Sequence, residues 1–330
     1  MTHLFILEGG VMMIKISRRP KPEKYRPTLT QTWTDMKRNK LAYLFIAPFM
    51  FCFVIFIVMP VLSATVLSFT QFDSISRPQF VGLRNFLDIL TRDLLLMTHV
   101  IPNTFIFAIA VGPIGYALQF ILAWLINCVP KRLKIIYTMA IYLPSIAGGV
   151  LISVVFTVFF SGDRLGHLNR FLLNLGMIVE PIAWTTDRDY LLLVMIIVTI
   201  WGSMGVGFLS LFAGMQNVDE QLYEAGRIDG IRNAFQELIH ITIPQMKPQM
   251  LFSAVMSIVG ALRAGSIGVQ LSGQNPTPEY AGQLWQNHIE DFGFQRFELG
   301  YATALSFVLL LFTYAITRLC FKFLGSKDDE

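Results

Sequence analysis

Residues Leu41–Phe69 read LAYLFIAPFMFCFVIFIVMPVLSATVLSF and contain no Asp, Glu, Lys or Arg. A helix of about 20 apolar residues is long enough to cross the hydrocarbon core of a bilayer. This run exceeds that length. Its two prolines, Pro48 and Pro60, are compatible with a spanning helix because neighbouring helices and local adjustments satisfy the freed backbone groups. The stretch therefore predicts a transmembrane helix.

The composition of the whole chain agrees with a membrane location. Of 330 residues, 54% are hydrophobic and 15% are charged, and the mean hydropathy is +0.56. Soluble domains carry about 25% charged residues. The 26 Lys and Arg residues stand against 22 Asp and Glu, a formal net charge of +4, which excludes a basic nucleic-acid-binding tract. These values predict an all-α integral membrane protein.

Further apolar stretches follow the first and predict six transmembrane helices in total. They are Ile101–Asn127, Ile135–Phe160, Tyr190–Ala213, Met250–Val269 and Leu299–Phe323. The predicted organisation is an N-terminal segment 1–40, a six-span domain 41–323 and a tail 324–330.

The basic residues predict the orientation of these spans. The segment before the first span is rich in cations, and the short second connection holds three of them, Lys131, Arg132 and Lys134. The first, third and fifth connections are longer and poorer in Lys and Arg. Because cytoplasmic loops are the ones enriched in Lys and Arg, both termini are predicted to be cytoplasmic in a multi-pass protein.

Signatures of catalysis are absent from the sequence. There is no G-x-x-x-x-G-K-[ST] loop to cradle phosphates, no H-E-x-x-H and no G-x-S-x-G. The cysteines, Cys52, Cys128 and Cys320, are too far apart for a metal-binding pair. We therefore expect a non-catalytic chain that binds no metal and no cofactor of its own.

Arg263 is the one strongly charged residue that stands out inside a predicted span. An intramembrane arginine is costly and by default faces a cavity or a partner. It is a candidate for contact with an anionic or hydroxyl-rich substrate. The alternative is that it pairs with a carbonyl or carboxylate near the outer interface by snorkelling. Ser203 and Ser257, small polar residues within spans, are further candidates for a substrate path.

The connection between the fourth and fifth spans, about residues 214–249, is the long patterned cytoplasmic segment. Asp219 is a plausible N-cap of a first helix, and Gly230 is a natural stop. A second helix is predicted after Gly230 from the spacing of its apolar residues, and Pro244 and Pro248 are expected to end it. Two short helices around a Gly corner predict a docking surface.

This segment resembles the EAA motif of permease subunits of binding-protein-dependent ATP-binding-cassette importers. The resemblance rests on Glu224-Ala225-Gly226, Asp229-Gly230 and Ile241-Thr242-Ile243-Pro244. The family pattern reads EAA, three residues, Gly, nine residues and I-x-L-P. Here ten residues separate Gly230 from Ile241, Gly226 replaces the second Ala, and Ile243 replaces Leu.

Other segments extend the resemblance over about residues 41–323 and point to the sugar-type, maltose-transporter-like branch. They are Ser68-Phe69-Thr70, Val81–Phe86, Leu143-Pro144, Leu168–Gly176 and the stretch from Trp201 to Gln216. The resemblance implies the type I importer permease fold, a bacterial inner-membrane location and transport of a di- or oligosaccharide, neutral or acidic.

The resemblance also implies partners and roles. Glu224, Ala225, Gly226 and Arg227 would form a coupling helix that docks on an ATP-binding subunit, and Asp229 and Gly230 would make the turn behind it. ATP and Mg²⁺ would be bound by a dimer of that separate subunit. A second, non-identical six-span permease, an extracytoplasmic solute-binding protein and membrane lipid complete the expected partners.

Two other classes of membrane protein would require features that this sequence does not have. A self-sufficient secondary transporter or channel should show internal repeats and coupling-ion carboxylates inside the spans, and the sequence shows neither. An integral-membrane enzyme should show a polar catalytic cluster, which the cytoplasmic segment lacks.

Overall fold

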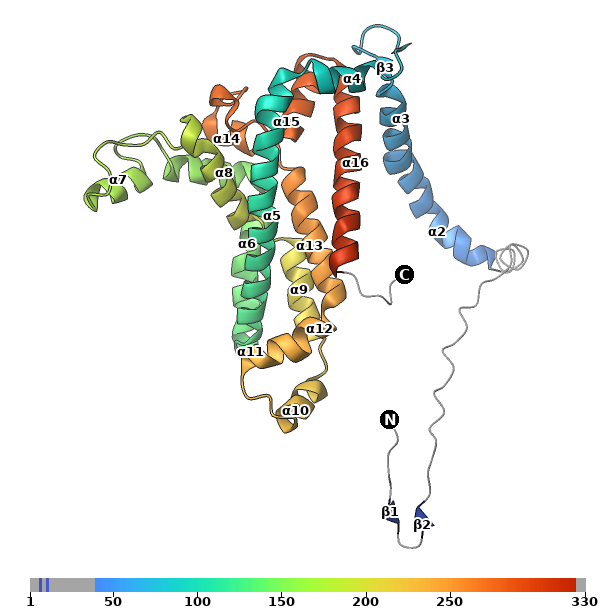
Figure 1. Ribbon diagram of the computed structural model, residues 1–330, viewed down its shortest axis with the longest axis vertical. Coiled ribbons are helices and arrows are strands. Elements are labelled where there is room, and N and C mark those ends of the chain that lie inside the picture. The colour runs from blue at the N-terminus through green and yellow to red at the C-terminus, as the bar shows by residue number, and fades with distance from the viewer. Residues whose placement is uncertain (1–5, 8–9, 12–38, 325–330) are drawn as a thin grey trace. The chain divides into compact units, whose positions relative to one another are not determined.

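The computed structural model describes residues 6–7, 10–11 and 39–324 (Figure 1). The predicted segment 1–40 and tail 324–330 therefore lie almost entirely outside the described residues. The described part is nearly all helical, with two pairs of two-residue strands. Antiparallel pairs join β1, Ile6–Leu7, to β2, Gly10–Val11, and β3, Thr70–Gln71, to β4, Gln79–Phe80. The chain divides into two units, Met1–Val61 and Leu62–Glu330.

The first unit contains most of the first apolar run. α2, Lys40–Phe53, continues through a π-helical turn, η1, Val54–Val58, into α3, Met59–Leu67. The central part of this helix has none of its residues buried. An apolar helix of this length, with no charged side chain after Lys40, suits a lipid environment, as the sequence predicts.

The second unit holds the remaining helices. Before the connection that joins the fourth and fifth predicted spans they are α4, Arg84–Thr91; η2, Leu96–Val100; α5, Ile101–Asn127; α6, Lys131–Phe159; α7, His167–Asn174; α8, Arg188–Gly202; and α9, Val206–Gln216. The connection forms α10, Glu220–Ile228; α11, Ala234–Glu237; η3, Leu238–Thr242; and α12, Ile243–Gln245. After it come α13, Lys247–Leu262; α14, Ile267–Ser272; η4, Pro278–Tyr280; α15, Trp285–Glu290; η5, Asp291–Gln295; and α16, Leu299–Leu324.

Within the described residues, four helices are long and apolar enough to cross a membrane, and a bent pair makes up to five. The four are Lys40–Leu67, Leu96–Asn127, Arg188–Gln216 and Leu299–Lys322. The bent pair is Lys131–Gly149 with Ser153–Phe159, at an angle of 98°. The first, second and sixth predicted spans thus have a matching long helix. The fourth corresponds to α8 and α9, which a short break at 203–205 separates, and the third is a bent helix.

The predicted fifth span, Met250–Val269, is wrong as one continuous helix. α13 begins earlier, at Lys247, and ends at Leu262, and α14 starts only at Ile267. At 16 residues α13 is a short apolar helix. A hydropathy window averages over such a break, because interrupting a helix removes backbone hydrogen bonds but leaves the apolar composition unchanged.

The core of the second unit forms where α5, α9 and α13 pack against one another (Figure 1). Glycines allow this close approach at two positions. A Cβ at Gly207 would lie 2.6 Å from Gln119 Oε1, and one at Gly214 would lie 2.9 Å from Gln249 Cγ. Small residues at helix interfaces are typical of membrane bundles. α16 packs on α13 from the other side.

A buried asparagine explains the motif Val81–Phe86. Asn85 Nδ2 donates to the carbonyl oxygens of Ser68 and Thr70, both at 2.9 Å. It therefore satisfies backbone groups at the end of the first apolar run and fixes α4 beside β3.

Candidate functional site

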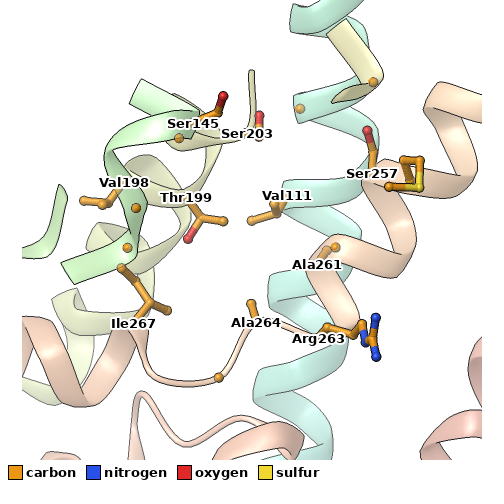
Figure 2. Close-up of a pocket in the computed structure, with 18 of the residues that line it drawn as sticks. Val111, Ser145, Val198, Thr199, Ser203, Ser257, Ala261, Arg263, Ala264 and Ile267 are labelled. Atoms are coloured by element: carbon orange, nitrogen blue, oxygen red, sulfur yellow. The ribbon is translucent and has the colours of Figure 1, made fainter. Parts of the chain in front are cut away.

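A cavity of about 490 Å³ lies in the second unit where three helices are interrupted (Figure 2). The first interruption is at Gly148 in α6, whose φ is +79°. The second separates α8 from α9 at Gly202–Gly205, and the third separates α13 from α14. Residues from all three interruptions line the cavity. Non-helical backbone at membrane depth is tolerated where it is buried in protein or lines a water-filled cavity, so this convergence indicates a site.

The lining combines small residues with neutral hydrogen-bonding groups. The polar side chains are those of Gln119, Ser145, Thr199, Ser203, Ser257, Ser266 and Gln270. Arg263 is the single charged residue among the described lining residues, which include no carboxylate. Hydroxyl and amide groups suit a ligand rich in hydroxyl groups.

The structure brings the three predicted substrate-path residues, Ser203, Ser257 and Arg263, to this one cavity. They come from the interruption between α8 and α9, from α13 and from its C-terminal end. Arg263 is exposed, and its side chain extends away from Thr199 in Figure 2. No carboxylate or carbonyl of the described residues pairs with its guanidinium.

Sequence reasoning missed Gln119, the residue that ties the helices around the cavity together. Its side chain is 3% exposed. Gln119 Nε2 donates to the Ser203 carbonyl oxygen at 2.9 Å, and Gln119 Oε1 accepts from Ser253 Oγ at 3.0 Å. The sequence feature that could have identified it is an amide side chain in the middle of the apolar run 101–127, since a polar residue within a span needs a hydrogen-bond partner.

The connection between α9 and α13 contains a two-part helix, as the sequence predicts. α10 begins after Asp219, whose carboxylate accepts from the Gln221 N–H at 3.0 Å, and the chain turns at Gly230 with φ of +98°. Glu224 and Ala225 are exposed, whereas Gly226 is buried.

The inner face of α10 rests on the following segment. A Cβ at Gly226 would lie 2.7 Å from Ile241 Cδ1. Tyr223 shares a hydrogen bond of 2.9 Å with Thr242. The exposed Arg227 makes an ion pair of 3.1 Å with Glu237. α10 thus presents Glu224 outward while its other side is packed.

The second helix differs from its prediction at both ends. It begins at Ala234, with Asn233 Oδ1 accepting from the Gln236 N–H at 2.8 Å, and it continues through η3 and α12 to Gln245. Pro244 does not end it. The π-helical turn Leu238–Thr242 accounts for the motif spacing, because a π turn accommodates one residue more than an α-helical turn. It also accounts for the tolerance of Pro244, because the backbone hydrogen bonds that proline would disrupt in an α-helix are rearranged there.

No group of three metal-ligating side chains comes together in the part of the chain that the structure describes. A cavity at interrupted apolar helices and a two-part helix between α9 and α13 are therefore the candidate functional features of the described residues.

Comparison with known proteins defines the family. Residues 120–322 match the model of the binding-protein-dependent transport system inner membrane component. The chain is 30% identical to the probable ABC transporter permease protein YesP of Bacillus subtilis over 87% of its own length and 91% of that protein. It is 28% identical to the arabinooligosaccharides transport system permease protein AraP of Bacillus subtilis, covering 90% of this chain and 93% of AraP.

A solved structure shares the fold. The chain superposes on a chain of the bacterial alginate ABC transporter, crystallised with an alginate pentasaccharide-bound periplasmic protein, with a TM-score of 0.73 and 21% identity, covering 87% of this chain and 95% of that chain. The chain belongs to the family of binding-protein-dependent transport system inner membrane components and is a multi-pass permease of this class.

Proposed function

We propose that this chain forms, with a second and non-identical six-span permease, the translocation path for a di- or oligosaccharide in an importer driven by a separate dimer of ATP-binding subunits. The observation that carries the proposal is the cavity at the three helix interruptions, which is lined by neutral hydrogen-bonding side chains and by Arg263. Relatives named for oligosaccharides support the substrate class, among them AraP and a lactose transport system permease, LacF of Rhizobium radiobacter, 28% identical over 84% of this chain and 92% of LacF.

Six membrane crossings and two cytoplasmic termini belong to the same proposal. Four long helices and the bent α6 account for five crossings, and α13 with α14 would supply the remaining one. This topology puts α10 on the cytoplasmic side, where the basic second connection also lies. An extracytoplasmic binding protein would deliver the sugar on the opposite side.

α10 is proposed as the coupling helix that docks on an ATP-binding subunit. Its outer face presents Glu224 and Ala225, with Ile228 87% exposed at its end. Arg227 and the Asp229-Gly230 turn hold this face in place through the Glu237 ion pair and the positive φ of Gly230. An exposed apolar residue beside a fixed charge suits a protein interface.

Charge reversal on α10 tests the coupling role. Glu224→Arg should abolish ATP-linked sugar uptake while the chain still inserts in the membrane, because its packed face is untouched. Glu298→Arg makes the same charge change at an exposed residue in the connection before α16 and should leave uptake near normal. Near-normal uptake by the Glu224 variant would contradict the coupling role.

Reconstitution separates the importer from a self-sufficient transporter. Purification of the chain with its neighbours should recover an ATP-binding subunit. Sugar uptake by this chain alone in liposomes without ATP would reject the proposal.

Arg263 gives the test for an acidic cargo. Arg263→Gln should lower uptake of a uronate oligosaccharide and spare a neutral one, because it removes the single charge among the described lining residues. Equal losses of uptake for both sugars would contradict a contact with an acidic sugar and would indicate that Arg263 has a structural role.

A further inference from the structure

The connection 161–187, between α6 and α8, is folded around one buried side chain. Asn169 is 0% exposed. Its Oδ1 accepts from the Ile182 N–H at 3.1 Å and from Trp184 Nε1 at 2.8 Å, and its Nδ2 donates to the Ser161 and Ile182 carbonyl oxygens at 3.1 and 2.9 Å. A Cβ at Gly166 would overlap the Ser161 carbonyl oxygen. These contacts hold the connection in one form, so the side chains on its surface have fixed positions.

That surface carries five large apolar side chains that contact little of the protein. They are Leu165, 82% exposed; Phe171, 60%; Leu175, 57%; Met177, 70%; and Val179, 90%. We call these residues the outer apolar patch. Exposed apolar patches of this kind mark interaction sites on proteins.

The outer apolar patch continues the apolar surface of α6. The part of α6 at Ser153–Phe159 is bent by 98° from the part at Lys131–Gly149, and it exposes Val154, Val155 and Val158. The Phe159 ring stacks on His167 of α7 at 6.5 Å. Figure 1 shows α7 to the side of the upright α5 and α16. The end of α6 and α7 thus form one lateral element with a shared apolar surface.

Cations and aromatic rings border this element. Arg164 and Arg170 are exposed and have no carboxylate partner among the described residues. Trp184 and Tyr190 contact each other at its base, with ring centroids 5.2 Å apart. Asp163 and Glu180 are the exposed acids of the same connection. Apolar side chains flanked by Arg and by Trp and Tyr match the chemistry of the membrane–water interface, where phosphates meet acyl chains.

We propose that the outer apolar patch lies in the interfacial layer of the bilayer and that phospholipid is its occupant, with acyl chains against Phe171, Met177 and Val179 and phosphate groups beside Arg164 and Arg170. The connection 161–187 then anchors the bent half of α6 to the lipid surface. This placement is independent of which sugar passes through the cavity.

Spin labelling of the assembled transporter in bilayer nanodiscs of phosphatidylethanolamine and phosphatidylglycerol tests the proposal. Cys52, Cys128 and Cys320 are first replaced by serine. A nitroxide is then placed at Phe171, Met177 or Val179, with exposed Thr186 of the same connection as the matched control. Collision rates are measured with oxygen, which concentrates in lipid, and with a water-soluble nickel chelate.

Labels in the outer apolar patch should collide several-fold more with oxygen than with nickel, relative to the label at Thr186. Preferential collision with nickel at the patch would mean that it faces water and would overturn the proposal. Immobile labels shielded from both reagents would assign the patch to a partner permease. Oxygen exposure that disappears on addition of the binding protein would assign it to that protein, and each of these two results also overturns the proposal.

A paired variant adds an independent readout. Met177→Asp with Val179→Asp should reduce the oxygen collision of a label at Phe171, because two carboxylates would draw the segment out of the apolar layer. Asn174→Asp adds a carboxylate at an exposed polar position of α7 and should leave that label unchanged. Unchanged oxygen collision in the paired variant would contradict a lipid contact.

Discussion

Gln119 connects three helices at the cavity, and its loss should therefore cost more than its size indicates. Gln119→Leu would leave the Ser203 carbonyl oxygen and the Ser253 hydroxyl without their partner. An unsatisfied buried polar group costs about 1–3 kcal/mol. We expect a lower thermal midpoint of the purified transporter and weaker uptake. Gln71→Leu, at an exposed glutamine of β3, serves as the control and should change neither the thermal midpoint nor the uptake. A Gln119→Leu variant with the wild-type midpoint and uptake would show that the hydrogen-bond network is dispensable.

Asp93, just before the helix that begins at Leu96, is partly buried and forms a second hydrogen-bond network with the buried His288. Its Oδ2 accepts from His288 Nε2 at 2.6 Å and from the Tyr301 hydroxyl at 2.8 Å, and its Oδ1 accepts from the Leu96 N–H at 2.9 Å. Burial by itself would raise the pKa of the Asp93 carboxyl, but these hydrogen bonds and the charge of His288 outweigh it and lower that pKa. The carboxylate thus stabilises the fold above its unfolded pKa of about 3.9, and this stabilisation is lost as the pH falls through the lower folded pKa.

Asp93→Asn should therefore destabilise the protein at pH 7, by about 1.5–3 kcal/mol for the loss of hydrogen bonds to a charged group. The difference in thermal midpoint between the wild type and the variant should narrow as the pH drops below about 4. Glu180→Gln, at an exposed position, serves as the control. A difference that stays constant from pH 7 to acid would show that the charge of Asp93 adds no stability.

The candidate site was predicted from the sequence in part. Arg263, Ser203 and Ser257 stood out because polar groups are rare in spans, and the structure places all three at one cavity. Gln270 and Ser145 line it as well, but no residue pattern distinguishes a polar side chain that faces a cavity from one that faces a neighbouring helix. That distinction depends on how helices distant in sequence pack.

At the level of elements, the packing of α10 depends on a small residue at position 226. Gly226→Ala should keep uptake, because the alanine methyl meets the terminal Cδ1 of Ile241, which can turn aside, and because alanine favours a helix by about 1 kcal/mol over glycine. Gly226→Leu should lose most ATP-linked uptake, since its side chain would push α10 off Ile231 and Ile241. Uptake and membrane insertion are measured for both variants. Full uptake by the leucine variant would show that the seating of α10 is unimportant.

The helix interruptions were the part of the fold that hydropathy could not predict. α8 and α9 lie in one apolar run, yet the chain leaves the helix at Gly202–Gly205. Helix breaks in a membrane bundle depend on partners for the freed backbone groups, such as Gln119 for the Ser203 carbonyl oxygen. The caps of α10 were predictable, because Asp219 and Gly230 act locally.

On the scale of the whole molecule, the proposed topology depends on whether α13 and α14 together form one membrane crossing. α13 alone is short for a crossing, and α14 follows it after a break that lines the cavity. If the two together cross the membrane, the connections on either side of them lie in different compartments. With six crossings, Gln295 and Arg232 lie on opposite sides of the membrane. With five crossings, in which α13 and α14 do not cross, the two residues lie on the same side.

Single cysteines and a thiol reagent that cannot cross the inner membrane distinguish these topologies. In a background without Cys52, Cys128 and Cys320, cysteines replacing Ser76, Thr186 and Gln295 should react in cells whose inner membrane is intact. Cysteines replacing Arg132 and Arg232 should react only after lysis, because the proposed topology has both positions in the cytoplasm. All five residues are exposed, so the reactivity of each cysteine reports the side of the membrane on which it lies and not its burial in the protein. Protection of the Gln295 cysteine in intact cells, with reaction at Ser76 and Thr186, would show that α13 and α14 do not complete a crossing.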